Sequence, residues 1–354
     1  MKEEQIAWKK KHLDEKRVSM KRRDDHHDYA ERRMYMITIE VEGRRPIFGH
    51  LEGDVFASSD SANAPHIVLS PLGRMVQNEW LGIPRYYPQI EVKGIQMMPD
   101  HFHGILFVKD RLPVHLGQVI SGFKAGCRKA LRMAATGGIT VAEPLPTVKT
   151  TPLTTGMNSQ QVAAVPSSNQ PLFTLGYNDL ILRSYDELST WLNYLRDNPR
   201  RLMMKRKNPE FLRPFFDLQV GPYTFSGVGN RGLLEAPRRI PFRISRRLVG
   251  NSLEQNVEHY LNEVRQGAVL VSPSISPGEK LTMRQAFNAG FPTIVIMENG
   301  FTPLSKPHGE QFYACAEGRL LMLSAWEHHN NKQKLTADMC RQMNLMALAI
   351  CGIK

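Results

Sequence analysis

Residues 97–108 read MMPDHFHGILFV and place two histidines, His101 and His103, in an otherwise apolar segment. Successive side chains of a strand point to opposite faces of a sheet. As a strand, the segment therefore puts both imidazoles on one face and Phe102 on the other. Two imidazoles can bind a divalent cation but leave most of its coordination sphere to water, substrate and a further protein group. Structural histidines are also common on half-buried strands, so both interpretations stay open from this motif alone.

The composition predicts a protein that binds an acidic polymer. The chain has 354 residues, enough for two domains, and a formal net charge of +12. Such a surplus favours nucleic acid over a membrane surface as the partner, and an indifferent basic surface is the alternative. No run approaches the roughly 18 apolar residues of a membrane span, and the N-terminus has no apolar signal-peptide region. Four scattered cysteines without a CxxC pair indicate reduced thiols. We therefore expect a cytoplasmic protein.

Changes in composition predict the domain organisation. Residues 1–28 are a charged arm, residues 29–214 a first domain, and residues 218–354 a second. Within the first domain, residues 134–171 are rich in Gly, Pro, Thr, Ser and Gln, which predicts a disordered insertion. In the second domain, continuous apolar strands alternate with amphipathic helices, as a parallel sheet covered on both faces requires.

A second polar pair lies on a predicted helix. Ser184 is its N-cap, Glu187 follows three residues later, and Pro199 ends it. Tyr194 and Asn198 are four residues apart and therefore neighbours on one helix face. A phenol is a weak nucleophile, but beside a bound cation that polarises a phosphate it can attack phosphorus and form a phosphotyrosine. Packing of Tyr194 in the core is the alternative.

The histidine segment resembles the HUH motif of single-tyrosine transposases, specifically the REP-associated tyrosine transposases, whose motif reads M-P-N-H-x-H before an apolar strand. The segment from Tyr194 to Pro199, YLRDNP, resembles the Y-I-x-x-N-P of that family, and LGQVISGFKAGCRKAL (116–131) resembles its intervening helix. The resemblance covers about residues 30–210. Asp100 replaces the usual Asn of the motif.

The resemblance implies the chemistry and the fold class. It implies an α+β chain, in which a ferredoxin-like HUH domain precedes an α/β Rossmann-like domain. In such a domain Tyr194 would be the nucleophile, and His101, His103 and Asn198 would bind Mg²⁺ or Mn²⁺. The implied substrate is single-stranded or hairpin DNA, which is nicked to leave a 5′-phosphotyrosine and a free 3′-OH. A homodimer and an association with the nucleoid are further expectations.

Positive charge and aromatic rings are the features that bind the backbone and the bases of single strands. On this basis we predict DNA contacts from Arg85, Tyr86, Tyr87, Lys124, Arg128, Arg200, Arg201, Lys205 and Arg206. A solvated helix end is the alternative for the basic residues after Pro199.

The second domain carries a G-x-G-x-x-G pattern at Gly227, Gly229 and Gly232, which predicts a phosphate-binding turn after a strand. The proline-terminated segment after it argues against a dinucleotide site. Residues 220–330 loosely resemble the Rossmann-like domain of DNA-processing protein A, which binds single-stranded DNA. A ligand crevice at the strand ends would then be lined by Ser272, Ser274, Gly278 and Lys280.

Three functions remain open from the sequence. The first is a metal-dependent DNA nickase and strand-transfer enzyme. The second is a catalytically idle hairpin-binding protein derived from one. The third is a nucleotide-handling protein that acts through its C-terminal domain.

Overall fold

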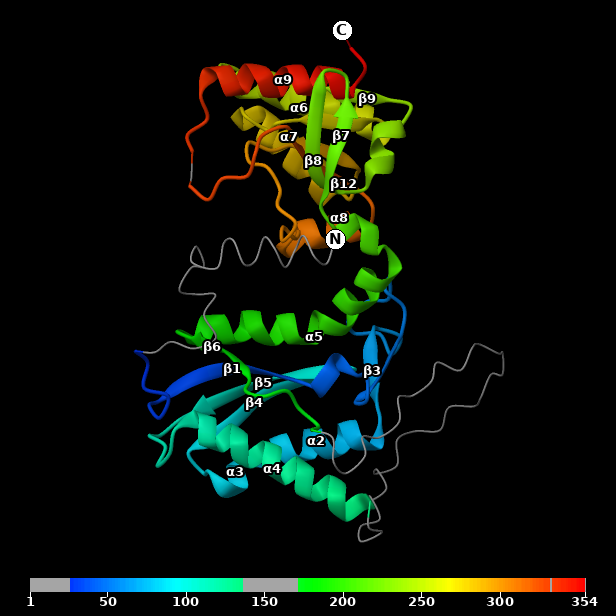
Figure 1. Ribbon diagram of the computed structural model, residues 1–354. Helices are drawn as coiled ribbons and strands as arrows, with labels where there is room; N and C mark the ends of the chain where they lie inside the picture. The colour runs from blue at the N-terminus through cyan, green and yellow to red at the C-terminus, as the bar shows by residue number, and fades with distance from the viewer. Residues whose placement is uncertain (1–25, 136–170, 332, 354) are drawn as a thin grey trace, which may run out of the picture. The chain divides into compact units, whose positions relative to one another are not determined.

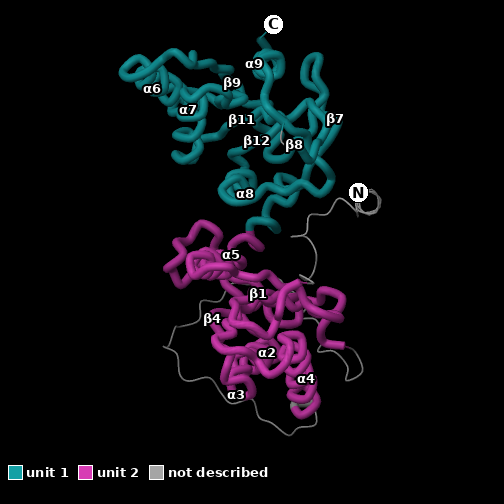
Figure 2. Tube along the Cα trace, turned by 90° about the vertical axis from the view of Figure 1, so that its left-hand side faces the viewer, with its two compact units in different colours: residues 1–15, 204–354 teal, residues 16–203 magenta. Residues whose placement is uncertain are grey.

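The computed structural model describes residues 26–135, 171–331 and 333–353. Most of the expected N-terminal arm and of the expected insertion lies outside these ranges. The described residues form two compact units that divide between Met203 and Met204 (Figure 2). We call them the N-terminal and the C-terminal unit. The division falls before the expected boundary at 214–218, because the short 3₁₀ helix η3 (Pro209–Leu212) packs against α8 (Gly309–Ala316) of the C-terminal unit.

The N-terminal unit is built on an antiparallel sheet with the strand order β4-β5-β1-β6. These strands are β4 (Ile90–Met97), β5 (His101–Val108), β1 (Arg33–Glu40) and β6 (Asn178–Leu182). A separate hairpin is formed by β2 (Gly49–Glu52) and β3 (His66–Leu69), and η2 (Glu42–Arg44) follows β1. The predicted strand at 101–108 is confirmed, with β1 on one side and β4 on the other.

Helices cover both faces of this sheet (Figure 1). On one face lie α2 (Pro71–Leu81), α3 (Ile83–Tyr86) and α4 (Leu116–Ala135), which enclose the main core. On the other face lies α5 (Tyr185–Lys207), whose Leu188 and Trp191 pack on Met34 and Phe107. The period-2 pattern of β5 therefore separates an apolar core face from a face covered by α5.

Helix α5 begins where the sequence indicates but does not end there. The Ser184 hydroxyl accepts a hydrogen bond from the Glu187 N–H. The expected stop at Pro199 is wrong, because the helix continues through this proline to Lys207. A proline inside a helix removes one backbone hydrogen bond. Here Leu195 and Met204, on either side of it, are both buried, and their packing offsets that loss.

The C-terminal unit has a six-stranded sheet with the order β7-β8-β12-β11-β10-β9. Its strands are β7 (Phe215–Val220), β8 (Tyr223–Gly229), β9 (Arg239–Pro241), β10 (Val269–Ser272), β11 (Thr293–Ile296) and β12 (Leu320–Ser324). Strands β9 to β12 are parallel, as expected, and β8 joins β12 antiparallel. The helices of this unit are α6 (Asn251–Arg265), α7 (Pro277–Asn288), α8 and α9 (Ala337–Ile350), with the short η4 (Arg231–Glu235).

Alternate residues of the parallel strands fill two separate cores. Val269 and Val271 of β10 pack with residues of α9, whereas Leu270 packs with α6 and α7. The chain is therefore a mixed α/β protein, consistent with the α+β expectation. Within the described residues no helix is both long and apolar enough to cross a membrane.

Candidate metal and tyrosine site

Strand β5 directs both histidines toward α5. Phe102 and Leu106 belong to the main core on the opposite face, and a Cβ on Gly104 would lie 2.3 Å from the Trp80 ring. His101 and His103 alternate with these residues and are partly buried. Their cross-strand partners share their face: Glu40 lies opposite His101, and both Thr38 and Gln96 lie opposite His103.

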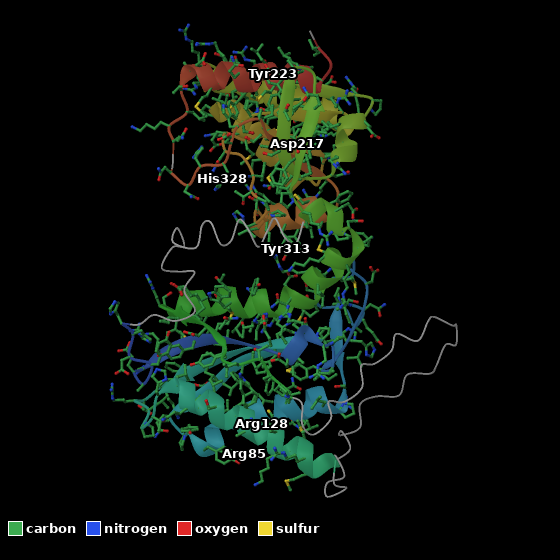
Figure 3. The ribbon with its side chains drawn as sticks, viewed as in Figure 1. Arg85, Arg128, Asp217, Tyr223, Tyr313 and His328 are labelled. Atoms are coloured by element: carbon green, nitrogen blue, oxygen red, sulfur yellow. The ribbon has the colours of Figure 1, made fainter. Side chains whose placement is uncertain are left out.

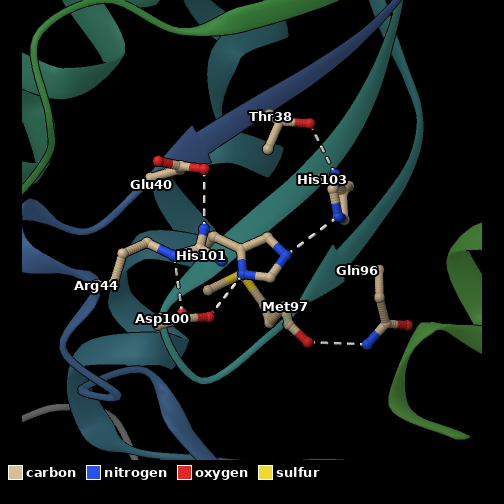
Figure 4. A network of polar contacts seen from close by, with 8 residues as sticks. All are labelled: Thr38, Glu40, Arg44, Gln96, Met97, Asp100, His101 and His103. Carbon is tan, nitrogen blue, oxygen red and sulfur yellow. Dashed lines mark hydrogen bonds and ion pairs between the residues drawn. The ribbon is translucent and has the colours of Figure 1, made fainter. Parts of the chain in front are cut away.

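A hydrogen-bond network orients both imidazoles (Figure 4). Asp100 Oδ1 lies 2.6 Å from His101 Nδ1, and Thr38 Oγ1 lies 2.8 Å from His103 Nδ1. The two Nε2 atoms then face each other at 3.2 Å. Arg44 binds the other oxygen of Asp100 at 3.1 Å and also donates to Glu40 at 2.9 Å.

The contact with Asp100 determines which nitrogen of His101 carries a lone pair. A carboxylate accepts only, so in neutral His101 the hydrogen is on Nδ1 and Nε2 is free to bind a cation. The Thr38 hydroxyl can either donate to or accept from Nδ1 of His103, and it accepts in the tautomer whose Nε2 is free to bind a cation. A cation bound by two imidazole nitrogens at about 2.1 Å separates them by about 3.0–3.4 Å at octahedral or tetrahedral angles. The observed Nε2–Nε2 distance fits that requirement.

Asp100 remains ionised beside His101. Burial raises the pKa of this carboxyl, but the hydrogen bond from His101 and the charges of His101 and Arg44 outweigh it and lower the pKa below its usual value. The carboxylate that replaces the usual Asn of the resembled motif is therefore a negative acceptor, which holds the ring and raises its basicity toward a metal.

Helix α5 runs antiparallel to β5 across the histidine face. The rings of Tyr185 and Phe107 contact each other at 6.1 Å between centroids, and a Cβ on Gly94, which is paired with Ile105, would lie 2.7 Å from Leu192. From Leu192 to Asn198 the helix rises about 9 Å. From Ile105 to His103 the strand advances about 7 Å. The contacts of Tyr185 with Phe107 and of Leu192 with the Gly94 position therefore place Asn198 and His103 at about the same position along the axis of β5.

The two predicted residues of α5 differ in their surroundings. Asn198 is 8% exposed, and its Nδ2 has no hydrogen-bond partner among the described residues. An unpaired buried amide costs stability unless something binds it. Tyr194 is 38% exposed, with its ring against the edge of Trp191 and the Arg201 guanidinium 5.7 Å from its centre. Tyr194 is therefore accessible to a substrate.

A metal ion at His101 and His103 would take its further ligands from other groups, such as carboxamide oxygens, water or substrate. Among the residues that the structure describes, no three His, Cys, Asp or Glu side chains are grouped to hold a metal ion. Asn198 of α5 is the predicted carboxamide ligand, and the strand register also places the carboxamides of Gln96 and Asn178 on this face. The sequence did not single out Gln96 or Thr38, because only the strand register places them beside His103.

The predicted DNA contacts come from α3 and the residue after it, from α4 and from α5. Arg85 and Arg128 lie in the layer of α3 and α4, away from α5 (Figure 3). Tyr86 of α3 is 79% exposed, and Tyr87 is partly buried in the core that α2 and α4 enclose. The remaining basic candidates are Lys124 of α4 and four residues of α5, namely Arg200, Arg201, Lys205 and Arg206, of which the last two belong to the C-terminal unit.

Two of these cations have structural partners instead. The Lys124 ammonium donates to the carbonyls of Thr174 and Gly176, and burial together with Arg128 lowers its pKa. The Arg200 guanidinium donates to the carbonyls of Val55 and Ala57. Both cations therefore hold a loop against a helix, and their contact with DNA stays a prediction.

The glycine pattern of the C-terminal unit does not form the expected turn. Gly227 and Gly229 lie inside β8, and Gly232 lies in η4. A Cβ on Gly227 would lie 2.5 Å from the Met322 carbonyl, and one on Gly229 would lie 2.2 Å from the Leu320 carbonyl. The expected phosphate-binding turn is therefore wrong, because these two glycines allow β12 to approach β8 closely.

The predicted crevice residues after β10 also have local roles. Ser272 is fully buried and accepts from the Ser274 N–H, while a Cβ on Gly278 would lie 2.4 Å from Ile244. Ser274 has a φ of 53° and borders a cavity together with Lys280. Of this set only Ser274 and Lys280 line an open space.

Comparison with known proteins gives weak similarities only. No protein-family model matches the chain. An uncharacterized protein of Haemophilus influenzae is 27% identical over 111 residues, which are 31% of this chain and 49% of that protein. The chain therefore spans about half the length of this relative.

Three solved structures are similar to parts of the chain. A REP-associated tyrosine transposase bound to a REP hairpin has a TM-score of 0.30 and 11% identity, over 50% of this chain and 72% of its own. DNA processing protein A from Helicobacter pylori has a TM-score of 0.28 and 19% identity, over 38% and 60%. A putative transposase from Deinococcus radiodurans has a TM-score of 0.25 and 12% identity, over 49% and 97%. Such low scores assign no function to this chain.

Proposed function

We propose that the N-terminal unit is a metal-dependent DNA nickase and strand-transfer domain that uses Tyr194 as its nucleophile. The observation that carries this proposal is the pair of opposed Nε2 atoms of His101 and His103, 3.2 Å apart, on the face that α5 covers. Helix α5 carries the exposed phenol of Tyr194 and the buried carboxamide of Asn198, whose Nδ2 has no hydrogen-bond partner among the described residues. The strand order β4-β5-β1-β6 supports a ferredoxin-like sandwich of the HUH class.

In the proposed reaction the Tyr194 oxygen attacks a backbone phosphorus of single-stranded or hairpin DNA. The new O–P bond replaces the P–O3′ bond, the phenolic proton leaves, and the 3′-oxygen departs as a hydroxyl after gaining a proton. The 5′ phosphate remains on the tyrosine, and attack by another 3′-OH reverses the step and joins strands. Mg²⁺ or Mn²⁺ held by His101, His103 and Asn198 would polarise the scissile phosphate.

The experiment combines labelled hairpin oligonucleotides with Mg²⁺ or Mn²⁺ and separates the products on denaturing gels. Tyr194→Phe removes the nucleophile, and Tyr185→Phe is the matched control because Tyr185 is an exposed tyrosine of the same helix. We expect a metal-dependent protein–DNA adduct that Tyr194→Phe and His101→Ala abolish and Tyr185→Phe retains. If a broad set of hairpins binds without any nick or adduct, the catalytically idle DNA-binding protein is the correct interpretation.

The same proposal extends to the cell and the assembly. We propose a homodimer associated with the nucleoid, and gel filtration with light scattering tests the dimer directly.

A further inference from the structure

The C-terminal unit contains a cavity that the proposed nicking reaction does not use. It has a volume of about 510 Å³ and lies against β11 and β12, where residues of α7 and of the α8 N-terminus line it. This volume lies within the usual range for small-molecule sites. Its apolar part is formed by Met283, Phe287, Val295, Leu320 and Met322. These side chains offer an apolar surface to the face of a flat ring.

One end of the cavity is suited to an anion. Lys280 lines it, and among the described residues its ammonium has no ion-pair or hydrogen-bond partner. The N-terminus of α8 also borders the cavity, and no side chain caps it, so the first N–H groups from Gly309 onward are free to donate. Glu310 would oppose an anion there, but Arg284 binds its carboxylate at 2.9 Å.

An independent observation comes from the wall formed by β11. Thr293 lines the cavity and is 1% exposed, yet its Oγ1 has no hydrogen-bond partner in the described part of the chain. A buried hydroxyl without a partner is costly, so it is expected to meet a polar group that binds there. The cavity thus combines a cationic end, an apolar surface and an unpaired hydroxyl.

We propose that this cavity binds a nucleoside 5′-phosphate. The phosphate would contact Lys280 and the α8 N–H groups, the base would lie on the apolar surface, and a polar edge atom of the base would bond to Thr293. The same chemistry is found in a free mononucleotide and at a 5′-phosphorylated DNA end. The proposal does not depend on catalysis by Tyr194.

The test uses the full chain and measures calorimetric affinity for dAMP, deoxyadenosine and the dinucleotide with and without a 5′ phosphate. We expect dAMP or the 5′-phosphorylated dinucleotide to bind at least tenfold more tightly than its unphosphorylated counterpart. Binding of dAMP identifies a free nucleotide as a ligand, and binding of the phosphorylated dinucleotide alone identifies the DNA end. No binding at millimolar concentration, or equal binding without the phosphate, overturns the proposal.

Two variants connect such binding to this cavity. Thr293→Val removes the unpaired hydroxyl at nearly constant shape, so the unliganded protein should unfold at the same or a higher temperature while its affinity falls about fivefold. Lys280→Met should weaken binding about tenfold, and Lys334→Met, at an exposed lysine outside the cavity, should not. A lower unfolding temperature of the unliganded Thr293→Val protein, or unchanged affinity in both cavity variants, contradicts the assignment.

Discussion

The Nε2 atoms of His101 and His103 face each other at 3.2 Å, while the Nδ1 atom of each ring is hydrogen-bonded to a different residue. Two lone pairs at that distance repel unless a proton or a cation lies between them. In the proposed cation site, Asp100 and Thr38 would therefore orient the two rings from the outside. Substitution of these outer residues should change metal affinity without removing either imidazole.

Thr38→Val should weaken divalent-cation binding about tenfold, because valine keeps the shape but offers no acceptor to His103 Nδ1. Titration calorimetry with Mn²⁺ measures the affinity. The matched control is Thr224→Val, whose hydroxyl donates to Gln219 in the C-terminal unit. Equal Mn²⁺ affinity of Thr38→Val and the wild-type protein, together with loss of binding in His103→Ala, would show that Thr38 does not orient the ring.

Gly104→Ala should destabilise the N-terminal unit by about 1–3 kcal/mol, because its Cβ would lie 2.3 Å from the Trp80 ring in a filled core. Gly122→Ala is the control. That glycine lies on an exposed position of α4 with nothing within 4 Å of the added Cβ, so the change should stabilise the protein by up to about 1 kcal/mol. Thermal unfolding and hydrogen exchange at β5 measure both effects. An unchanged unfolding temperature in Gly104→Ala would mean that Trp80 can move away.

The sequence predicts the strand that carries the histidines, and the face they share, better than it predicts which residues of other strands lie beside them. The alternation of His101, Phe102 and His103 is local, so a period of two was sufficient to place both imidazoles on one face. Thr38 and Gln96 come from other strands, and only the pairing register brings them to His103. Register depends on long-range packing, which the local pattern does not contain.

Two wrong predictions have a similar cause. Pro199 is a local stop signal, but buried residues on both sides of it keep α5 helical to Lys207. Gly227 and Gly229 match the spacing of a phosphate-binding turn, yet their missing side chains serve the contact between β8 and β12. In both cases tertiary packing outweighs a short sequence signal.

Alkylation by iodoacetamide should label Cys340 first in the native protein. Cys127 and Cys315 are fully buried, and burial raises the pKa of the Cys127 thiol and that of the Cys315 thiol, the latter to about 12. The thiolate is the reactive form, so both should react slowly at pH 8. Cys340 is only partly buried. Peptide mass spectrometry over a time course measures each rate, and native labelling of Cys127 as fast as that of Cys340 would contradict the packing described here.

Two arginines of α5 differ in their surroundings: Arg200 has backbone partners within the protein, whereas Arg206 is an exposed residue and a predicted DNA contact. The Arg200 side chain is 17% exposed and donates to two backbone carbonyls of the loop at residues 55–57. Arg200→Gln should therefore lower the free energy of unfolding of the N-terminal unit by about 1–3 kcal/mol. Arg206 is exposed. Arg206→Gln should leave stability unchanged and reduce the salt dependence of single-strand binding by about 0.7 in its logarithmic slope.

Urea unfolding and fluorescence anisotropy at several salt concentrations measure the two properties for each variant. If Arg206→Gln keeps the full salt slope while Arg200→Gln loses part of it without any loss of stability, then Arg200 contacts the DNA backbone despite its carbonyl partners. In that case the loop at residues 55–57 would have to release the guanidinium when DNA binds.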